Sequence, residues 1–186
     1  MRISTAGKST VGEDFVLRGG LVLLRPFNEA DIDARYIGWL NDPDVVRFSN
    51  QRFKTHDQAS SSRYFASFEG TDNLFISIRD ISSDAPLGTM TAYISRHHGT
   101  VDVGIMIGEK CVWGSGYGQD AWNTLAKWLF RRGDIRKLTA GTMRNNQGMI
   151  KLMERSGMHL EATRRKQELL GTEAVDILYY AKFRGE

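Results

Sequence analysis

The segment between Val101 and Ala121 constrains the fold more than any other part of the chain. It begins with a strand pattern at 101–107, continues with glycines at positions 114, 116 and 118, and ends in a helix pattern. Glycine permits backbone angles that other residues avoid and lets a ligand approach the chain closely. Free N–H groups at the start of a helix, aided by the helix dipole, attract anions. The segment therefore predicts a phosphate or pyrophosphate site, with a glycine-rich connecting turn as the alternative.

Two common nucleotide-binding motifs do not match these glycines. A P-loop needs Gly-x-x-x-x-Gly-Lys-Ser/Thr, and no lysine follows the glycines here. A Rossmann fingerprint needs Gly-x-Gly-x-x-Gly near the start of a βαβ unit and an acidic residue about 20 residues later. The spacing here is Gly-x-Gly-x-Gly, and Asp134 falls at the far end of the following helix rather than at the end of a strand.

Short apolar or alternating runs predict seven strands. Pro26 ends the first of them, and the short connection Arg96–Thr100 suits a hairpin. The expected strands are Leu21–Leu24, Leu74–Arg79, Leu87–Ser95, Val101–Ile107, Lys137–Met143, Leu160–Arg164 and Val175–Phe183.

Apolar residues at helical spacing predict four helices between these strands. Asn28 is suited to cap the first, and Asn41-Asp42-Pro43 ends it because the residue before proline avoids the helical region. Thr55-x-x-Gln58 has capping-box form and predicts the start of the second. The other two are expected at Gln119–Arg132 and at about Gly148–Ser156, with Gly157 as the final stop.

The chain of 186 residues, 41% of them hydrophobic, is long enough for one well-packed domain. Residues 1–14 are small and polar without periodicity, and they predict a flexible leader before a single domain at 15–186. No internal repeat or linker interrupts the domain. We therefore expect an α/β fold of the α+β type, with a mixed, mostly antiparallel sheet and helices on both faces.

Charge and cysteine content narrow the class of protein. The net charge is +3, and no lysine-rich tail or basic-aromatic pattern indicates nucleic-acid binding. Cys111 is the single cysteine, so no internal disulfide is expected and a reducing compartment fits. The sequence has no signal-peptide core and no stretch near the roughly 20 apolar residues of a membrane span. We expect a cytoplasmic protein without a membrane partner.

The glycine segment resembles a known family. Trp113–Gly118 is similar to the pyrophosphate loop of GNAT acetyltransferases, and the Trp-Gly-x-Gly-Tyr run followed by an acidic-Ala pair resembles the RimJ/RimL-like branch. Asn146–Met158 resembles that branch's Asn-x-x-Ser-x-x-Leu-x-x-x-x-Gly-Phe segment. Leu-Leu-Arg-Pro at 23–26, Trp-Leu-Asn-Asp-Pro at 39–43 and the late Asp176 follow in the usual order. The resemblance extends over roughly residues 20 to 183 and predicts the GNAT fold.

This resemblance implies acetyl-CoA as co-substrate and assigns residues to it. Ile105, Met106 and Ile107 would lie along the pantetheine arm, with core packing as the alternative for their side chains. Asn146 would hydrogen-bond the arm, or would cap the helix that follows it. The pyrophosphate would be held by backbone N–H groups of Trp113, Gly114, Ser115, Gly116, Tyr117 and Gly118.

Asp102 is the expected general base for an amine acceptor. Strand alternation sends its side chain to the face opposite Val101 and Val103. Members of the RimJ/RimL branch often carry Glu at this place, and the shorter Asp would need a water to relay the proton. The alternative is an acidic residue that faces solvent or pairs with an arginine.

The general acid departs from the family pattern. Met153 stands where many GNAT enzymes have the Tyr that protonates the leaving thiolate, and Met149 stands where RimL-like members often have Ser. Tyr180 or a bound water is the substitute that we consider. No histidine or cysteine spacing resembles a metal site.

These observations predict an N-acetyltransferase that passes the acetyl group directly to a primary amine. The acceptor is either a small molecule, including nucleotide-linked amino sugars, or a protein N-terminus of the ribosomal-protein type. Arg47, Arg52 and Arg63 could meet phosphates on an anionic acceptor, and solvated surface is the alternative. A catalytically silent CoA-binding or regulatory module is the alternative function. A strand exposed near Val175–Phe183 could pair across a homodimer.

Overall fold

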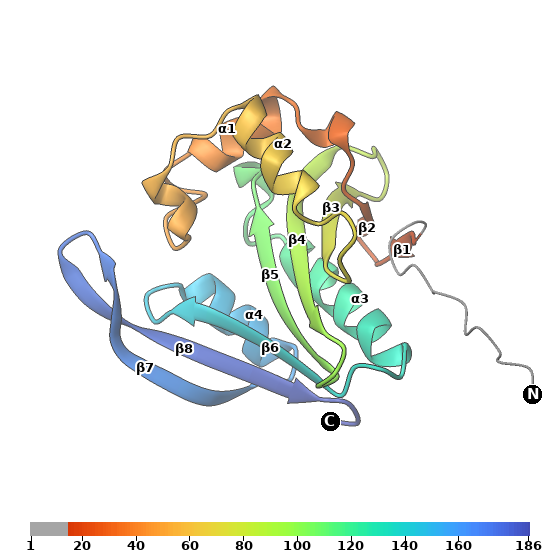
Figure 1. Cartoon of the computed structure of the whole chain (residues 1–186), viewed down its shortest axis with the longest axis vertical. Helices are drawn as coiled ribbons and strands as arrows, with labels where there is room; N and C mark the ends of the chain where they lie inside the picture. The colour runs from red at the N-terminus through yellow and green to blue at the C-terminus, as the bar shows by residue number, and fades with distance from the viewer. Residues whose placement is uncertain (1–14) are drawn as a thin grey trace, which may run out of the picture.

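The computed structural model describes residues 15–186 and contains one sheet of eight strands in the order β1-β2-β3-β4-β5-β6-β8-β7 (Figure 1). The expected leader, residues 1–14, lies outside the described residues. All neighbouring strands are antiparallel except β5 and β6. The strands are β1 Leu17–Arg18, β2 Val22–Pro26, β3 Leu74–Asp80, β4 Pro86–Ser95, β5 Thr100–Ile107, β6 Lys137–Met143, β7 His159–Leu170 and β8 Glu173–Phe183.

Helices cover both faces of this sheet, as the sequence predicts. α3 (Tyr117–Arg131) and α4 (Gln147–Arg155) bury one face of each against the main core, where Trp122 is almost fully buried. α1 (Ala34–Asn41) and α2 (Gln58–Ala66) lie on the opposite face, over a second cluster built around Phe75. This separation follows from strand alternation, because Phe75 points away from the side taken by Leu74 and Ile76.

The first two helices begin later than the sequence predicts. Asn28 caps a 3-10 turn at Glu29–Asp31, and the α-helix then starts at Ala34 with Asp33 as its cap. The second helix starts at Gln58, because the Asp57 carboxylate accepts the Ser60 N–H at 2.7 Å. In both cases the sequence offers two capping residues a few positions apart, and the later one caps the α-helix.

The parallel pair β5–β6 is short. Thr100, Val101 and Asp102 pair with Lys137, Leu138 and Thr139, and the register ends there. Figure 1 shows the two strands diverging from this point, with β5 running toward α1 and β6 toward the tip of the β7–β8 hairpin. Beyond Asp102, β5 is therefore hydrogen-bonded on its β4 side only.

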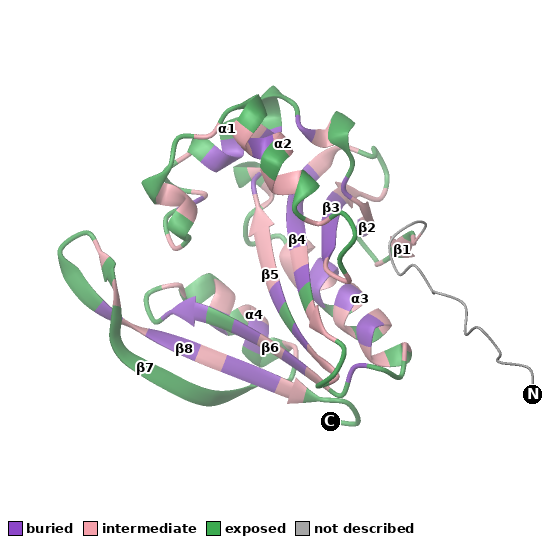
Figure 2. Cartoon of the chain, viewed as in Figure 1, coloured by how far each residue is buried: buried purple, intermediate pink, exposed green. Residues whose placement is uncertain are grey.

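The C-terminal hairpin differs from expectation in two ways. β7 extends to Leu170 instead of ending at Arg164, and it forms the edge of the sheet. β8 lies between β6 and β7 with both edges paired, so it is not the exposed strand that could pair across a dimer. Figure 2 shows the contrast, since β7 is exposed along most of its length whereas β8 is largely buried.

Among residues 15–186, no helix has the combination of length and hydrophobicity that crossing a membrane requires.

Candidate active site

The free edge of β5 is the first feature of the site. The Gly108 N–H donates to the Leu87 carbonyl at 2.9 Å, so alternation in the antiparallel ladder turns the backbone groups of Met106 toward β4. The backbone groups of Ile105 and Ile107 then point to the other side, where β6 has already left. The Trp113 indole N–H confirms this direction by donating to the Ile107 carbonyl at 2.8 Å.

The backbones of Ile105, Met106 and Ile107, which were predicted together to contact the pantetheine arm, point in different directions. Ile105 offers its N–H and carbonyl to the gap between β5 and β6, and an extended amide chain can pair with such an edge. Met106 has its backbone engaged with β4, and its side chain packs against the cluster under α1 and α2. The Ile105 and Ile107 side chains pack against the main core.

The glycine loop turns sharply before α3. Gly114 and Gly116 have φ angles of +78° and +91°, in the left-handed region that favours glycine. A side chain at Gly114 would find nothing within 4 Å, and one at Gly116 would first meet the Leu21 side chain at 3.6 Å. The loop is thus open on its outer side, where a ligand can approach the backbone.

Only part of the loop's N–H groups are available to a ligand. The Trp113 N–H donates to the Lys110 carbonyl at 3.1 Å, and the Ser115 N–H donates to the Val112 carbonyl at 3.2 Å. These two amides shape the turn itself. In the described part of the chain, no partner is found for the N–H groups of Gly114, Gly116, Tyr117 and Gly118. Four N–H groups at the start of a 15-residue helix can hold a pyrophosphate.

Two carboxylates that the sequence analysis did not assign hold the start of α3 in place. The Tyr117 hydroxyl donates to Asp80 at 2.9 Å, and that carboxylate also accepts hydrogen bonds from the Ser82 and Ser83 hydroxyls. These hydrogen bonds hold the pKa of Asp80 well below its usual range. Asp120, in the first turn of α3, accepts three backbone N–H groups of the chain entering β2.

Asn146 is the N-cap of α4. Its side-chain oxygen accepts the Met149 N–H at 3.2 Å, and its amide nitrogen donates to the Thr142 hydroxyl at 3.1 Å. The capping alternative is therefore correct. A carboxamide has two N–H donors, so one of them is left for a ligand.

Asp102 lies on the face that alternation predicts. Its neighbours Val101 and Val103 are buried in the main core, whereas its own carboxylate accepts the Thr139 hydroxyl of β6 at 2.8 Å. Burial raises the pKa of Asp102, and the Thr139 hydrogen bond opposes this rise. No cation pairs with this carboxylate among residues 15–186, so the arginine alternative is wrong, whereas Asp102 is exposed on this face, as the solvent-facing alternative predicts.

Asp102 opens into a cavity of about 250 Å³ on the face of the sheet opposite α3 and α4. Its floor comes from β6 and β8, and the chain after α1 closes one side. Three of its lining residues, Tyr179, Glu168 and Asn50, were not predicted as site residues from the sequence. The lining residues are Phe48, Asn50, Asp102, Gly141, Thr142, Met143, Glu168, Ile177 and Tyr179.

Tyr180, the residue considered as general acid, and the two positions where the family has Tyr and Ser are not among the residues that line this cavity. Met153 is fully buried in the main core, and Met149 packs beside it. Tyr180 lies on the α4 side of the sheet, where its hydroxyl donates to Glu154 at 3.2 Å. Burial and this hydrogen bond raise the pKa of Tyr180.

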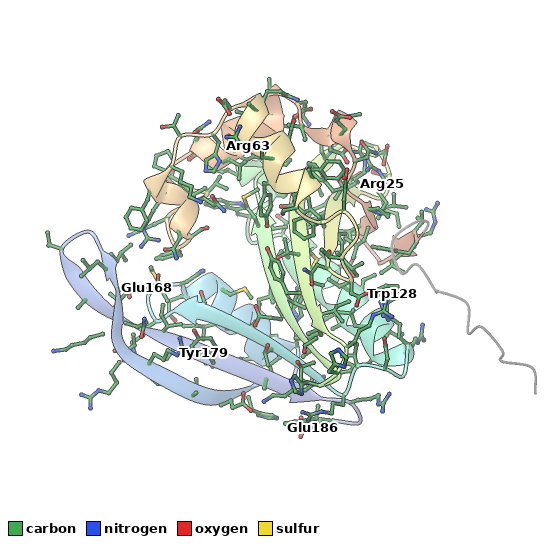
Figure 3. The ribbon with its side chains drawn as sticks, in the orientation of Figure 1. Arg25, Arg63, Trp128, Glu168, Tyr179 and Glu186 are labelled. Atoms are coloured by element: carbon green, nitrogen blue, oxygen red, sulfur yellow. The ribbon has the colours of Figure 1, made fainter. Side chains whose placement is uncertain are left out.

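The three arginines considered for an anionic acceptor do not line the cavity. Arg47 and Arg52 lie over the rings of Phe48 and Phe53. Arg63 is exposed on α2 at the far end of the molecule from Tyr179 (Figure 3). Among residues 15–186, no group of three His, Cys, Asp or Glu side chains could hold a metal ion.

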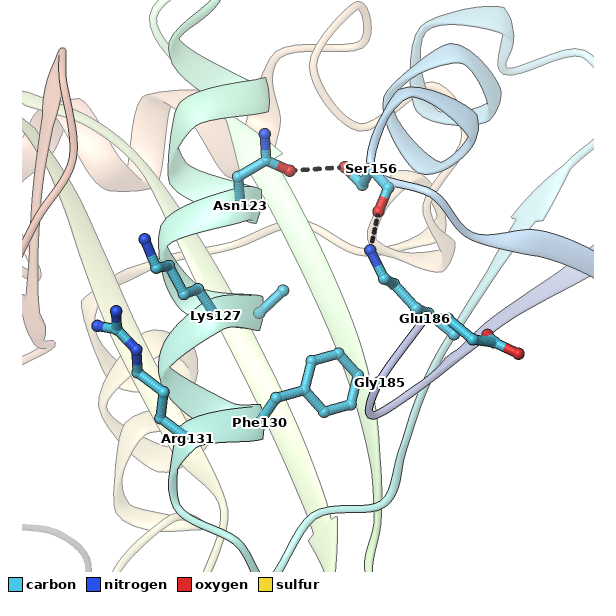
Figure 4. A pocket seen from close by; sticks show the side chains of 9 residues that line it. Asn123, Lys127, Phe130, Arg131, Ser156, Gly185 and Glu186 are labelled. Carbon is cyan, nitrogen blue, oxygen red and sulfur yellow. Dashed lines mark hydrogen bonds between the residues drawn. The ribbon is translucent and has the colours of Figure 1, made fainter.

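A second cavity of about 460 Å³ lies beside the later turns of α3 and the C-terminal residues (Figure 4). Its lining includes Lys127, Arg131 and Lys182, and the Lys182 ammonium donates to the Ser156 carbonyl at 2.8 Å. This cavity contains none of the residues expected to bind acetyl-CoA.

Solved structures of acetyltransferases share this fold. A GNAT-family acetyltransferase from Bacillus anthracis superposes with a TM-score of 0.79 at 19% identity, covering 92% of this chain and 100% of that one. RimL, a ribosomal L7/L12 alpha-N-protein acetyltransferase solved in complex with coenzyme A, gives 0.81 at 16% identity, covering 91% and 98%. The ribosomal-protein-S5-alanine acetyltransferase from Vibrio fischeri gives 0.79 at 14%, covering 93% and 98%.

The fold of this chain is therefore that of these acetyltransferases, and the RimL neighbours agree with the RimJ/RimL-like resemblance. The sequence profile described as an acetyltransferase (GNAT) domain matches residues 22–159, and the protein therefore belongs to this family. Comparison with curated proteins by sequence finds no significant match.

Proposed function

We propose that this enzyme transfers the acetyl group of acetyl-CoA directly to a primary amine, with Asp102 as general base. One observation carries the proposal. The unpaired edge of β5, the free N–H groups before α3 and the Asp102 carboxylate all belong to one strand–loop–helix unit. In this unit, the proposed cofactor site and the proposed acceptor site would both lie next to β5.

The cofactor would lie along the gap between β5 and β6. The N–H groups of Gly114, Gly116, Tyr117 and Gly118 would hold the pyrophosphate, while Trp113 and Ser115 shape the turn. The free carbonyl of Ile105 would accept a hydrogen bond from an amide of the pantetheine arm, which leaves the Ile105 N–H for the thioester carbonyl. The remaining N–H donor of Asn146 would reach the same arm from the opposite side of the gap.

The proposed chemistry is one displacement. The neutral amine nitrogen forms a bond to the thioester carbonyl carbon, the carbon–sulfur bond breaks, and CoA leaves as the thiolate. The amine proton passes to Asp102 directly or through one water. A lysine-like amine has a pKa of about 10.4 and an α-amine about 7.7–8.0, so a base with a raised pKa assists at neutral pH. The Ile105 N–H is the proposed oxyanion donor, worth about 10²–10³ in rate.

The acceptor would enter the cavity beside Asp102. Its volume of about 250 Å³ suits a short amine or the first residue of a peptide. RimL and the S5-alanine acetyltransferase, which have the same fold, are named for ribosomal-protein acceptors, and this supports a protein acceptor. The carboxylates in the cavity count against a phosphate-bearing acceptor. A single cysteine fits a reducing compartment, and we place the reaction in the cytoplasm.

Isothermal titration with acetyl-CoA tests the cofactor site on the parent, Gly116→Ala and Gly116→Glu. Both variants bear the same strain at a φ of +91°, but only Glu adds a negative charge beside the pyrophosphate. We expect micromolar binding by the parent, a modest loss in the Ala variant and no binding by the Glu variant. No binding by a folded parent, checked by circular dichroism, would overturn the proposal.

A catalytically silent CoA-binding module remains the second proposal, favoured by Met153 and Met149, which put apolar side chains where the family has hydroxyls. Asp102→Asn distinguishes the two. An enzyme would keep acetyl-CoA binding and lose turnover in this variant, whereas a silent module would show no turnover with any amine in the parent.

A further inference from the structure

Glu168 is a second carboxylate in the acceptor cavity, on the edge strand β7. Ten of the twelve residues of β7 are exposed, and Glu168 and Leu170 are the two that are not. Figure 3 shows Glu168 on the part of the hairpin that reaches toward the chain after α1. A charged residue that is withdrawn from solvent on an otherwise exposed strand requires a cause.

The pairing with β8 accounts for this position, because Glu168 lies opposite Val175 on the same face as Ile177, which lines the cavity; a bulge in β7 precedes it. The register between β7 and β8 shifts between Arg164 and Glu168, and Lys166 adopts a left-handed φ of +50°. The Asp176 carboxylate holds this bulge by accepting the Lys166 N–H at 2.9 Å, and it also pairs with Arg144 at the end of β6. A bulge turns the residues that follow it. Beyond the bulge, Glu168 pairs with Val175 and lines the cavity.

No cationic side chain lines the cavity to balance its carboxylates. Its nine lining residues include Asp102 and Glu168 but no lysine, arginine or histidine. Neither carboxylate forms an ion pair within residues 15–186. The nearby guanidinium of Arg52 donates to the Leu169 carbonyl at 2.8 Å, and that of Arg164 lies 4.9 Å from the centre of the Tyr179 ring.

We propose that Glu168 selects acceptors that carry a second positive charge besides the reacting amine, as aliphatic diamines do. This inference rests on the proposed function. The reacting amine must be neutral when it attacks, so its proton passes to Asp102, while the second ammonium stays protonated against Glu168. Attraction between opposite charges is strong where water is partly excluded and is weakened by salt.

Titration calorimetry in the presence of saturating CoA measures acceptor binding without requiring turnover. Putrescine, butylamine and γ-aminobutyrate share a four-carbon chain and differ in the group at the far end, which is cationic, apolar or anionic. We expect putrescine to bind about tenfold tighter than butylamine, as for one partly buried ion pair, and γ-aminobutyrate to bind weakest. The preference for putrescine should shrink as salt is added.

Glu168→Gln keeps the size of the side chain and removes its charge. It should raise the Kd and KM for putrescine about tenfold and change the Kd for butylamine much less. Glu173→Gln, on an exposed residue of the same hairpin, is the matched control and should change nothing. Equal binding of putrescine and butylamine, or an equal loss for both in Glu168→Gln, would overturn this inference. Those results would leave the acetyl-CoA titration, and with it the proposed function, untouched.

Discussion

At the scale of single residues, Asp102 and Thr139 face each other across the last pair of the parallel β5–β6 ladder. Burial raises the pKa of the carboxyl, which makes it a better proton acceptor, and the hydroxyl of Thr139 stabilises the ionised form. Burial and the Thr139 hydrogen bond thus have opposite effects on the pKa of the proposed base. Strand alternation in the sequence is enough to place Asp102 on this face, but its hydroxyl partner is 37 residues away in the chain.

Thr139→Val tests this tuning. Removing the hydrogen bond destabilises the carboxylate relative to the carboxylic acid, so the pKa of Asp102 should rise further. The acid limb of kcat/KM should therefore move to higher pH, while the plateau above it stays near the parent value. The pH profile with a saturating amine concentration and varied acetyl-CoA measures this shift.

Asp102→Asn is the reference for that profile. It should lose about 10²–10⁴ in kcat and show no acid limb from this group, while acetyl-CoA still binds. An unmoved limb in Thr139→Val, or a limb that persists in Asp102→Asn, would assign the pH dependence to another group, such as the acceptor amine itself.

At the scale of elements, the start of α3 is held by side chains that lie outside the glycine motif. The Asp120 carboxylate accepts the N–H groups of Gly20, Leu21 and Val22 at 3.1, 2.7 and 3.1 Å. It also places a negative charge in the first turn of the helix, which the helix dipole favours. Asp120, the acidic residue of the Asp-Ala pair, therefore connects α3 to β2 and fixes the position of the glycine loop relative to the sheet.

Asp120→Ala should lower the free energy of unfolding by about 2–3 kcal/mol, because charge-assisted hydrogen bonds to backbone N–H groups are lost. Asp120→Asn should lose less, since its carboxamide oxygen can still accept one or two of them. Chemical denaturation measures both, with Glu69→Ala, a change at an exposed residue, as control. Equal stability of Asp120→Ala and the parent would contradict this role.

α1 packs on the end of β5 through one close contact. A side chain at Gly108 would lie 2.0 Å from the Trp39 indole, so only glycine fits there. Gly38, which precedes Trp39 in α1, is exposed, and a Cβ added there would have nothing within 4 Å. Gly108, which contacts α1, and Gly38, on the exposed side of α1, should therefore respond in opposite ways to an added side chain.

Gly108→Ala should destabilise the protein by about 1–3 kcal/mol through overpacking. Gly38→Ala should stabilise it by about 0.5–1 kcal/mol, because alanine favours the helix interior. Thermal and chemical unfolding of the two variants check the opposite signs. A stability gain in both would show that Trp39 moves freely away from β5.

At the scale of the whole molecule, the sheet consists of two parts, β1–β5 and β6–β8, joined side by side over three residue pairs. The gap that opens beyond these pairs is the proposed cofactor site, and its two walls belong to different parts of the sheet. A ligand in the gap would replace the missing strand pairing. Binding should therefore stabilise the fold as a whole.

Acetyl-CoA at about 100 times its Kd should add about 2.7 kcal/mol to the free energy of unfolding. For a chain of this size, that corresponds to a rise in Tm of about 5–10 °C. Differential scanning fluorimetry measures it, and Gly116→Glu should show no rise. A parent Tm that does not respond to acetyl-CoA would contradict a ligand in the gap.

The sequence by itself determined the local features of this protein. Helical and strand periods are properties of neighbouring residues, so the helices and most strands lie where the patterns predict. The glycine loop at 113–118 and the face of Asp102 are equally local, since a left-handed turn needs glycine and alternation needs only the strand. The early start expected for α1 failed because two capping residues, Asn28 and Asp33, compete within one short segment.

The tertiary structure alone decided which groups meet. The short β5–β6 register leaves Ile105 with a free backbone edge, and register depends on residues far apart in the chain. The turn itself uses two loop N–H groups, which no motif distinguishes from the four that stay free. Glu168 lines the acceptor cavity through the pairing of β7 with β8 beyond a bulge that Asp176 stabilises, and no local pattern records this pairing. The periodicity of neighbouring residues determines helices and strands, whereas the site depends on the distances between residues of different elements.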